Sequence, residues 1–103
     1  MEMEYNGWSN RETWATNLWI ENEYALAKDF EIFWSELHQE DDEMLETTPE
    51  MVRKFADYIE QTITELLSFE NMNRATYSML TDIGSLYRVD WWEIAKAYEG
   101  VLA

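Results

Sequence analysis

The sequence predicts an all-α protein, folded as a single compact bundle of four to five helices over residues 1–103. Three observations favour this class. Apolar residues recur with the 3.6-residue period of a helix in several segments, whereas no segment alternates as a half-buried strand does. Hydrophobic residues make up 47% of the chain, enough to build a core, and only three Gly and one Pro interrupt the pattern. A length of 103 residues fits one domain.

The first helix is expected to begin shortly after the turn dipeptide Asn6-Gly7. Ser9 and Glu12 have the spacing of a capping box, which predicts Ser9 as the N-cap residue. Trp14 and Leu18 then follow four residues apart, so they lie on one face of the helix.

A second apolar stripe, whose members also follow the helical period, begins eight residues further on. Its centre lies about 100° from the face of Trp14 and Leu18 if one continuous helix carries both. Either a single helix turns two faces to the core, or the helix breaks near Asn22; we favour the break. The stripe consists of Leu26, Phe30, Phe33, Trp34 and Leu37.

The third helix has the clearest start in the sequence, after a polar, solvated connection over residues 39–47. Thr48 is expected to cap it, with Pro49 at its first position. Glu50, Arg53, Lys54 and Asp57 can form ion pairs along it. Its apolar positions keep a helical period over nearly five turns: Val52, Phe55, Ala56, Ile59, Ile63, Leu66 and Leu67.

Two shorter helices complete the predicted bundle. Gly84 ends the fourth helix, because glycine readily adopts the left-handed conformation of a helix C-terminus. Asp90 is expected to cap the last helix, with Glu93 at the capping-box position. Trp91 and Trp92 are adjacent and cannot both face the core, so one of them is expected to be partly exposed.

The net charge is −15, and it is distributed unevenly. Residues 21–46 contain ten acidic residues and one base, Lys28, a net charge of −9. Such a chain is a poor ligand for nucleic acids and anionic membranes, because their phosphates are bound mainly by Lys and Arg. A basic protein surface is the partner that this charge favours.

Carboxylates one helical turn apart lie about 5–6 Å from one another, and duplex DNA carries one phosphate per about 1.7 Å of its axis. An exposed acidic helix can therefore imitate a row of phosphates for a basic groove. The alternative is a solvated acidic face without a partner. The candidate partner-binding residues are Asp29, Glu31, Glu36, Glu40, Asp41, Asp42, Glu43 and Glu46.

The sequence offers little that indicates catalysis, a cofactor or a metal. It has no cysteine, no glycine-rich phosphate loop and no EF-hand order of acids. His38 is the only histidine, lacks the Glu-x-x-His spacing, and is expected to be exposed to solvent. No catalytic or metal-binding residue is predicted, and the protein is not expected to be an enzyme.

Two segments resemble a known family. Residues 5–14, YNGWSNRETW, continuing to Asn17-Leu18-Trp19-Ile20, and residues 82–91, DIGSLYRVDW, are similar to signatures of a family of small uncharacterised proteins from bacteriophages and other mobile elements. The resemblance implies an accessory protein that works in the cytoplasm of a bacterial host. It implies no activity and no catalytic residues.

The leading hypothesis is a non-catalytic DNA mimic that inhibits a host nucleic-acid-binding defence protein, such as a restriction or CRISPR effector, by occupying its basic groove. A second hypothesis is an interaction module or homodimeric adaptor that binds through an exposed aromatic or apolar patch, with Trp92 or Trp19 as candidate contacts. High salt would weaken the first kind of binding and leave the second largely unchanged.

Overall fold

The computed structural model describes residues 5–40 and 43–100, which form five α-helices. Three short 3₁₀ helices and a small hairpin connect them. The predicted all-α class and helix number are therefore confirmed. The elements are α1 (Arg11–Asn22), α2 (Tyr24–Leu37), β1 (Gln39–Glu40), β2 (Glu43–Met44), α3 (Pro49–Leu66), η1 (Phe69–Asn71), α4 (Arg74–Ile83), η2 (Leu86–Arg88), α5 (Trp91–Lys96) and η3 (Ala97–Gly100).

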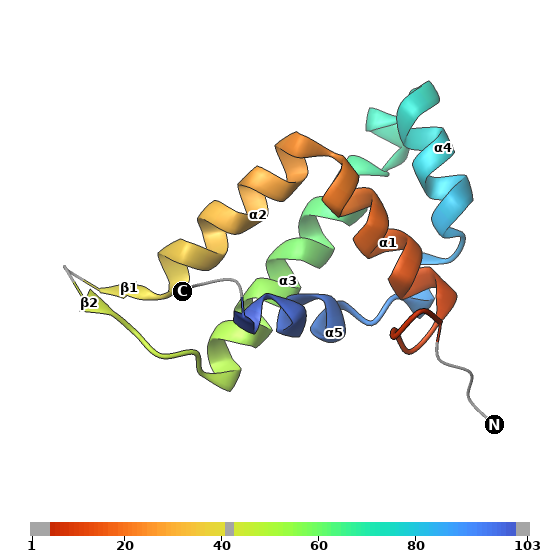
Figure 1. The fold of residues 1–103 in the computed structure, drawn as a ribbon. Coiled ribbons are helices and arrows are strands. Elements are labelled where there is room, and N and C mark those ends of the chain that lie inside the picture. The colour runs from red at the N-terminus through yellow and green to blue at the C-terminus, as the bar shows by residue number, and fades with distance from the viewer. Residues whose placement is uncertain (1–4, 41–42, 101–103) are drawn as a thin grey trace.

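Helix α3 runs through the middle of a flat molecule measuring 42 × 37 × 20 Å (Figure 1). Helix α2 packs on one side of α3 and α5 packs on the other, while α1 contacts α2, α4 and α5. The hairpin of β1 and β2 lies beyond the C-terminal end of α2, and α4 lies at the opposite end of the molecule (Figure 1). Each flank of α3 therefore forms a surface together with a neighbouring helix, α2 on one flank and α5 on the other.

Most helix boundaries follow the local capping chemistry. Thr48 Oγ1 accepts a hydrogen bond from the Met51 backbone N–H at 3.2 Å, and Pro49 begins α3 as predicted. Asp90 Oδ1 accepts from the Glu93 N–H at 3.1 Å at the start of α5. At the end of α4, Gly84 has φ +87°, a conformation that side chains rarely adopt.

The predicted break between the first two helices is confirmed. Helix α1 ends at Asn22, and Glu23 has an extended backbone (φ −104°, ψ 104°) that changes the direction of the chain. The predicted N-cap was wrong by one residue. Asn10 caps α1, because its Oδ1 accepts a hydrogen bond from the Thr13 N–H at 2.8 Å, and Ser9 serves another purpose, described below.

Aromatic side chains hold α2 against α3. Phe30 and Trp34 of α2 and Phe55 of α3 are fully buried. The rings of Phe33 and Tyr58 stack at 3.9 Å with their planes 2° apart, nearer the surface. Burying large aromatic side chains supplies much of the free energy that attaches α2, because each removes a large apolar area from water.

Candidate functional site

Three of the predicted partner-binding residues, Asp29, Glu31 and Glu36, are exposed on α2. The ion pairs of the described residues join other acids, namely Asp82, Glu50 and Glu12, to Arg11, Lys54 and Arg88. Within residues 5–40 and 43–100, therefore, no lysine or arginine neutralises these α2 carboxylates at ion-pair distance.

The α2 acids lie on two sides of the helix and do not form a single row. Asp29 and Glu36 are seven residues apart, which places them on one side, about 10 Å apart along the axis. That side faces Tyr58, whose hydroxyl donates a hydrogen bond to Asp29 Oδ2 at 2.8 Å. Glu31 lies on the other side, where it lines a hollow together with Tyr98.

Carboxylates on the two sides of α2 raise the pKa values of two different tyrosines. The pKa of Tyr58 is raised, first because its hydroxyl donates to Asp29 and then because of its burial, with a smaller electrostatic contribution from Glu36. The pKa of Tyr98 is raised to about 12 by burial and by the negative charges of Glu31 and Glu21. The pKa of each tyrosine is therefore affected by the carboxylates on its own side of α2.

The outward ridge between these two sides is not acidic. Tyr24, Lys28 and Ile32 are four residues apart along α2, and all three are exposed, Tyr24 at 79% and Ile32 at 49%. We name this helix surface, with its two sides of carboxylates and its central ridge, the α2 edge. Lys28 places one positive charge in the middle of it.

The remaining predicted residues lie in or beside the hairpin. Glu43 and Glu46 are exposed. Glu40 is paired in register with Glu43, and its side chain lies outside the described part of the structure, as do Asp41 and Asp42. The segment predicted as a solvated connection thus contains a two-stranded antiparallel hairpin.

The expectation that His38 is exposed to solvent was wrong. The side chain is 1% exposed, with Nδ1 2.8 Å from the Trp34 carbonyl oxygen and Nε2 2.7 Å from Thr47 Oγ1. Because a carbonyl can only accept, Nδ1 carries a proton in this arrangement and donates it to the Trp34 carbonyl oxygen. His38 therefore closes the base of the hairpin. Its position four residues after Trp34, in line with the buried stripe, was a signal for burial.

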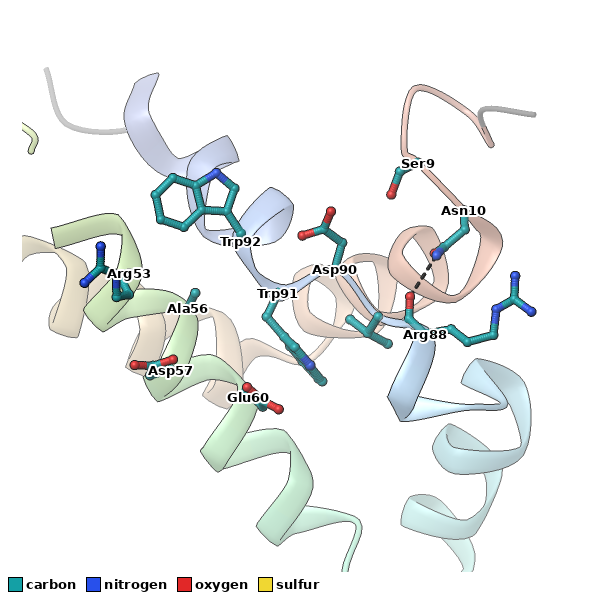
Figure 2. A pocket seen from close by; sticks show the side chains of 11 residues that line it. Ser9, Asn10, Arg53, Ala56, Asp57, Glu60, Arg88, Asp90, Trp91 and Trp92 are labelled. Carbon is teal, nitrogen blue, oxygen red and sulfur yellow. Dashed lines mark hydrogen bonds between the residues drawn. The ribbon is translucent and has the colours of Figure 1, made fainter. Parts of the chain in front are cut away.

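A groove of ≈ 900 Å³ lies on the other flank of α3 (Figure 2). One wall is α3, which contributes Arg53, Asp57 and Glu60. The facing wall is formed by residues 88–92, at the junction of η2 and α5, together with residues 9–10. We name this hollow the Trp92 groove.

Hydrogen bonds between distant segments fix the second wall of the Trp92 groove. The Ser9 hydroxyl donates to Glu93 Oε1 at 2.8 Å, and the Ser9 N–H also points to this carboxylate. The Asp90 N–H donates to Thr13 Oγ1 at 2.8 Å, and the Asn10 amide donates to the Arg88 carbonyl oxygen at 2.7 Å. Glu93 therefore holds Ser9 and does not complete the predicted capping box with Asp90.

A family model matches residues 1–99, and its description is "Family of unknown function (DUF7249)". The chain belongs to this family. The match includes both segments for which a family resemblance was noted, and its description assigns no activity. No curated protein and no solved structure matches the chain.

The Trp92 groove was not predicted, because its two walls are more than 25 residues apart in sequence. The signal that the sequence did offer was the adjacent pair Trp91 and Trp92, one of which was expected to be partly exposed. Trp92 is 40% exposed, which confirms that expectation. No sequence pattern connected this side chain with Asp57 and Glu60.

Within residues 5–40 and 43–100, no group of three or more His, Asp or Glu side chains is arranged to hold a metal ion. None of the helices in this part of the chain combines the length and apolar character needed to cross a membrane.

Proposed function

We propose that this protein is a non-catalytic DNA mimic that binds the basic groove of a nucleic-acid-binding protein. The observation that carries the proposal is the α2 edge. Its carboxylates are exposed, and no Lys or Arg of the described residues pairs with them. Charges left in this state keep a strong local field, which attracts a cationic surface and raises the rate of association.

The carboxylates on two sides of α2 indicate how a partner would contact this helix. Asp29 and Glu36 lie on one side of α2 and Glu31 on the other, separated by roughly the 10 Å diameter of a helix. A basic groove that accepts a duplex contacts two phosphate backbones. We therefore infer that the partner grips α2 from both sides, with Lys and Arg facing each set of carboxylates.

The folded scaffold supports the same function. Asp29 is held by Tyr58, and α2 is attached to α3 through buried aromatic side chains. Acids fixed on a helix lose less conformational entropy on binding than acids in a flexible segment do. The base of the hairpin, closed by His38 and Thr47, places Glu43 and Glu46 next to the end of the α2 edge.

The class of partner rests on the family resemblance and on the charge. The segments at residues 5–14 and 82–91 resemble a family from bacteriophages and mobile elements, which would place the protein in the cytoplasm of a bacterial host. In that setting, a restriction or CRISPR effector is the partner that a DNA mimic would inhibit.

Competition with DNA tests the proposal. A fluorescent duplex bound to each member of a panel of purified restriction and CRISPR effectors is titrated with the protein. We expect displacement from at least one effector. The variant Asp29→Asn/Glu31→Gln/Glu36→Gln should bind that effector about 10- to 100-fold more weakly, since each of three surface ion pairs contributes up to about 1 kcal/mol.

A matched variant separates the α2 edge from net charge alone. Glu50→Gln/Glu65→Gln/Glu70→Gln removes the same number of exposed carboxylates outside α2. We expect it to displace DNA almost as well as the unmodified protein. Equal losses in the two variants, or displacement from no effector, would contradict the proposal.

The rival function, binding through an exposed apolar or aromatic patch, would depend much less on the salt concentration. Displacement by the α2 edge should weaken steeply between low and high salt, because the Debye length falls from about 10 Å at 0.1 M to about 3 Å at 1 M. Persistent binding at high salt that is lost on substituting Trp92 would favour an interaction module or a homodimer.

A further inference from the structure

The Trp92 groove lies on the opposite flank of α3 from Asp29 and Glu36, and the proposed DNA mimicry makes no use of it. It combines a concave shape with carboxylates on both walls and an exposed indole (Figure 2). Asp57 and Glu60 belong to the α3 wall, and Asp90 belongs to the facing wall. We propose that the Trp92 groove is a docking site for an arginine side chain presented by a protein partner.

The charges of the groove favour a cationic occupant. Asp57, Glu60 and Asp90 are all exposed, and the described residues place none of them in an ion pair. Of the two arginines that line the groove, Arg88 is directed to Glu12, with Nε 3.7 Å from Oε2. Three carboxylates therefore line the groove with one guanidinium, that of Arg53, for which the described residues form no ion pair.

The side chains that line the groove surround a hollow of ≈ 900 Å³. Figure 2 shows Asp57 and Glu60 projecting from α3 along the groove, with Arg53 at its outer end. Trp91 lies between the two walls, and Trp92 stands above it at the rim. Asp90 Oδ1 accepts the Glu93 N–H, so Oδ2 of the same carboxylate is left for a ligand.

An arginine matches this set of groups better than other side chains do. A guanidinium can donate two parallel hydrogen bonds to a carboxylate while its flat face stacks on an indole ring. Tryptophan is the aromatic side chain that attracts a cation most strongly, and Trp and Arg are among the residues enriched at energetic hot spots of interfaces. A lysine ammonium would gain the charge attraction without the planar stacking.

Hydrogen bonds to the start of α1 hold the wall that carries Trp92. Glu93 follows Trp92 in α5 and is fixed by its hydrogen bonds to Ser9, while the Asp90 N–H is fixed by Thr13. A wall whose backbone is already fixed loses less entropy when a partner docks on it than a flexible segment does. The partner is therefore a protein whose surface presents an arginine that can enter the ≈ 900 Å³ hollow.

A direct titration tests the proposal without any DNA-binding protein, so its outcome is independent of the proposed mimicry. The probe is a blocked pentapeptide with one arginine between glycines, and the readout is the NMR signal of the Trp92 indole N–H at low salt. We expect saturable shifts with a dissociation constant of about 1 mM. The citrulline analogue, which has the same shape without the charge, should bind about tenfold more weakly, and the lysine analogue should lie between them.

Two variants with equal charge loss locate the binding. Asp57→Asn/Glu60→Gln should weaken arginine binding about tenfold, whereas Asp29→Asn/Glu36→Gln, on the other flank, should leave it nearly unchanged. A Trp92→Leu variant, followed through the Trp91 indole, should also lose binding. Equal affinity for the citrulline peptide, equal losses in the two double variants, or no saturable shift at about 10 mM peptide would overturn the proposal.

Discussion

The two flanks of α3 carry acidic side chains in different surroundings. On the flank toward α2, Asp29 and Glu36 are exposed on an open helix edge, and Asp29 also accepts a hydrogen bond from Tyr58. On the flank toward α5, Asp57 and Glu60 line a groove that also contains Trp92 and Arg53. The numbers of charges are similar, so charge alone does not distinguish the flanks.

The difference lies in shape and in aromatic content. Charges on an open edge act over distances of about a Debye length and mainly affect how fast a partner arrives and in which orientation. Charges in a groove beside an indole ring act at contact distance, where a particular side chain can be recognised. We therefore expect the α2 edge to steer a partner and the Trp92 groove to select it.

The largest expected effect comes from a variant that removes packing between α2 and α3. Phe30 is fully buried between α2 and α3, so Phe30→Ala should lower the free energy of unfolding by about 3–5 kcal/mol. Ile32→Ala, at an exposed position of the same helix, should cost less than about 0.5 kcal/mol. Urea unfolding measures both values.

Hydrogen exchange of the Phe30→Ala variant shows whether the flanks differ in local stability. Amides of α2 should lose more protection than those of α5, because α5 keeps its contacts with α3 and α1. Equal loss of protection in the two helices would mean that the flanks behave as one cooperative unit.

An intermediate effect is expected when the wall of the Trp92 groove is loosened. Glu93→Gln removes the charge that accepts from the Ser9 N–H and hydroxyl, and charged hydrogen bonds are about 1 kcal/mol stronger than neutral ones. We expect a loss of about 1–2 kcal/mol in urea unfolding, and a neutral result for Glu99→Gln, an exposed acid of η3. An unchanged stability in Glu93→Gln would show that the wall does not depend on this contact.

The smallest expected effect tests the division of acids between the two sides of α2. Burial, followed by the charges of Glu31 and Glu21, raises the pKa of Tyr98 to about 12. Glu31→Gln should lower this pKa, whereas Glu36→Gln, on the other side of the helix, should not. Ultraviolet titration of tyrosinate, with Tyr98→Phe to assign the signal, measures the shift. Equal effects of the two variants would contradict the two-sided arrangement.

The same tyrosine predicts how stability changes in alkali. Because the pKa of Tyr98 is higher in the folded protein than the ordinary value of 10.0, the folded state holds this proton more tightly. The resulting stabilisation is complete below pH 10 and is lost as the pH rises toward 12. Tyr98→Phe should flatten this part of the stability profile.

The sequence by itself determined the helices and most of their ends. Thr48, Gly84 and Asp90 act through hydrogen bonds or backbone preferences within one turn, so neighbouring residues are sufficient to predict them. The break near Asn22 was predicted for a similar local reason, since the apolar face changes direction there. The excess of acids in residues 21–46 was also plain from the chain alone.

Only the tertiary structure decided which side chains meet. His38 is buried because the chain after α2 turns back to Thr47, and Glu93 holds Ser9 because α5 packs beside the start of α1. The neighbours of each side of the α2 edge, Tyr58 and Tyr98, and the Trp92 groove depend on how α3 sits between α2 and α5. Helix propensity and capping act over a few residues, whereas these arrangements arise from packing between helices that are distant in sequence.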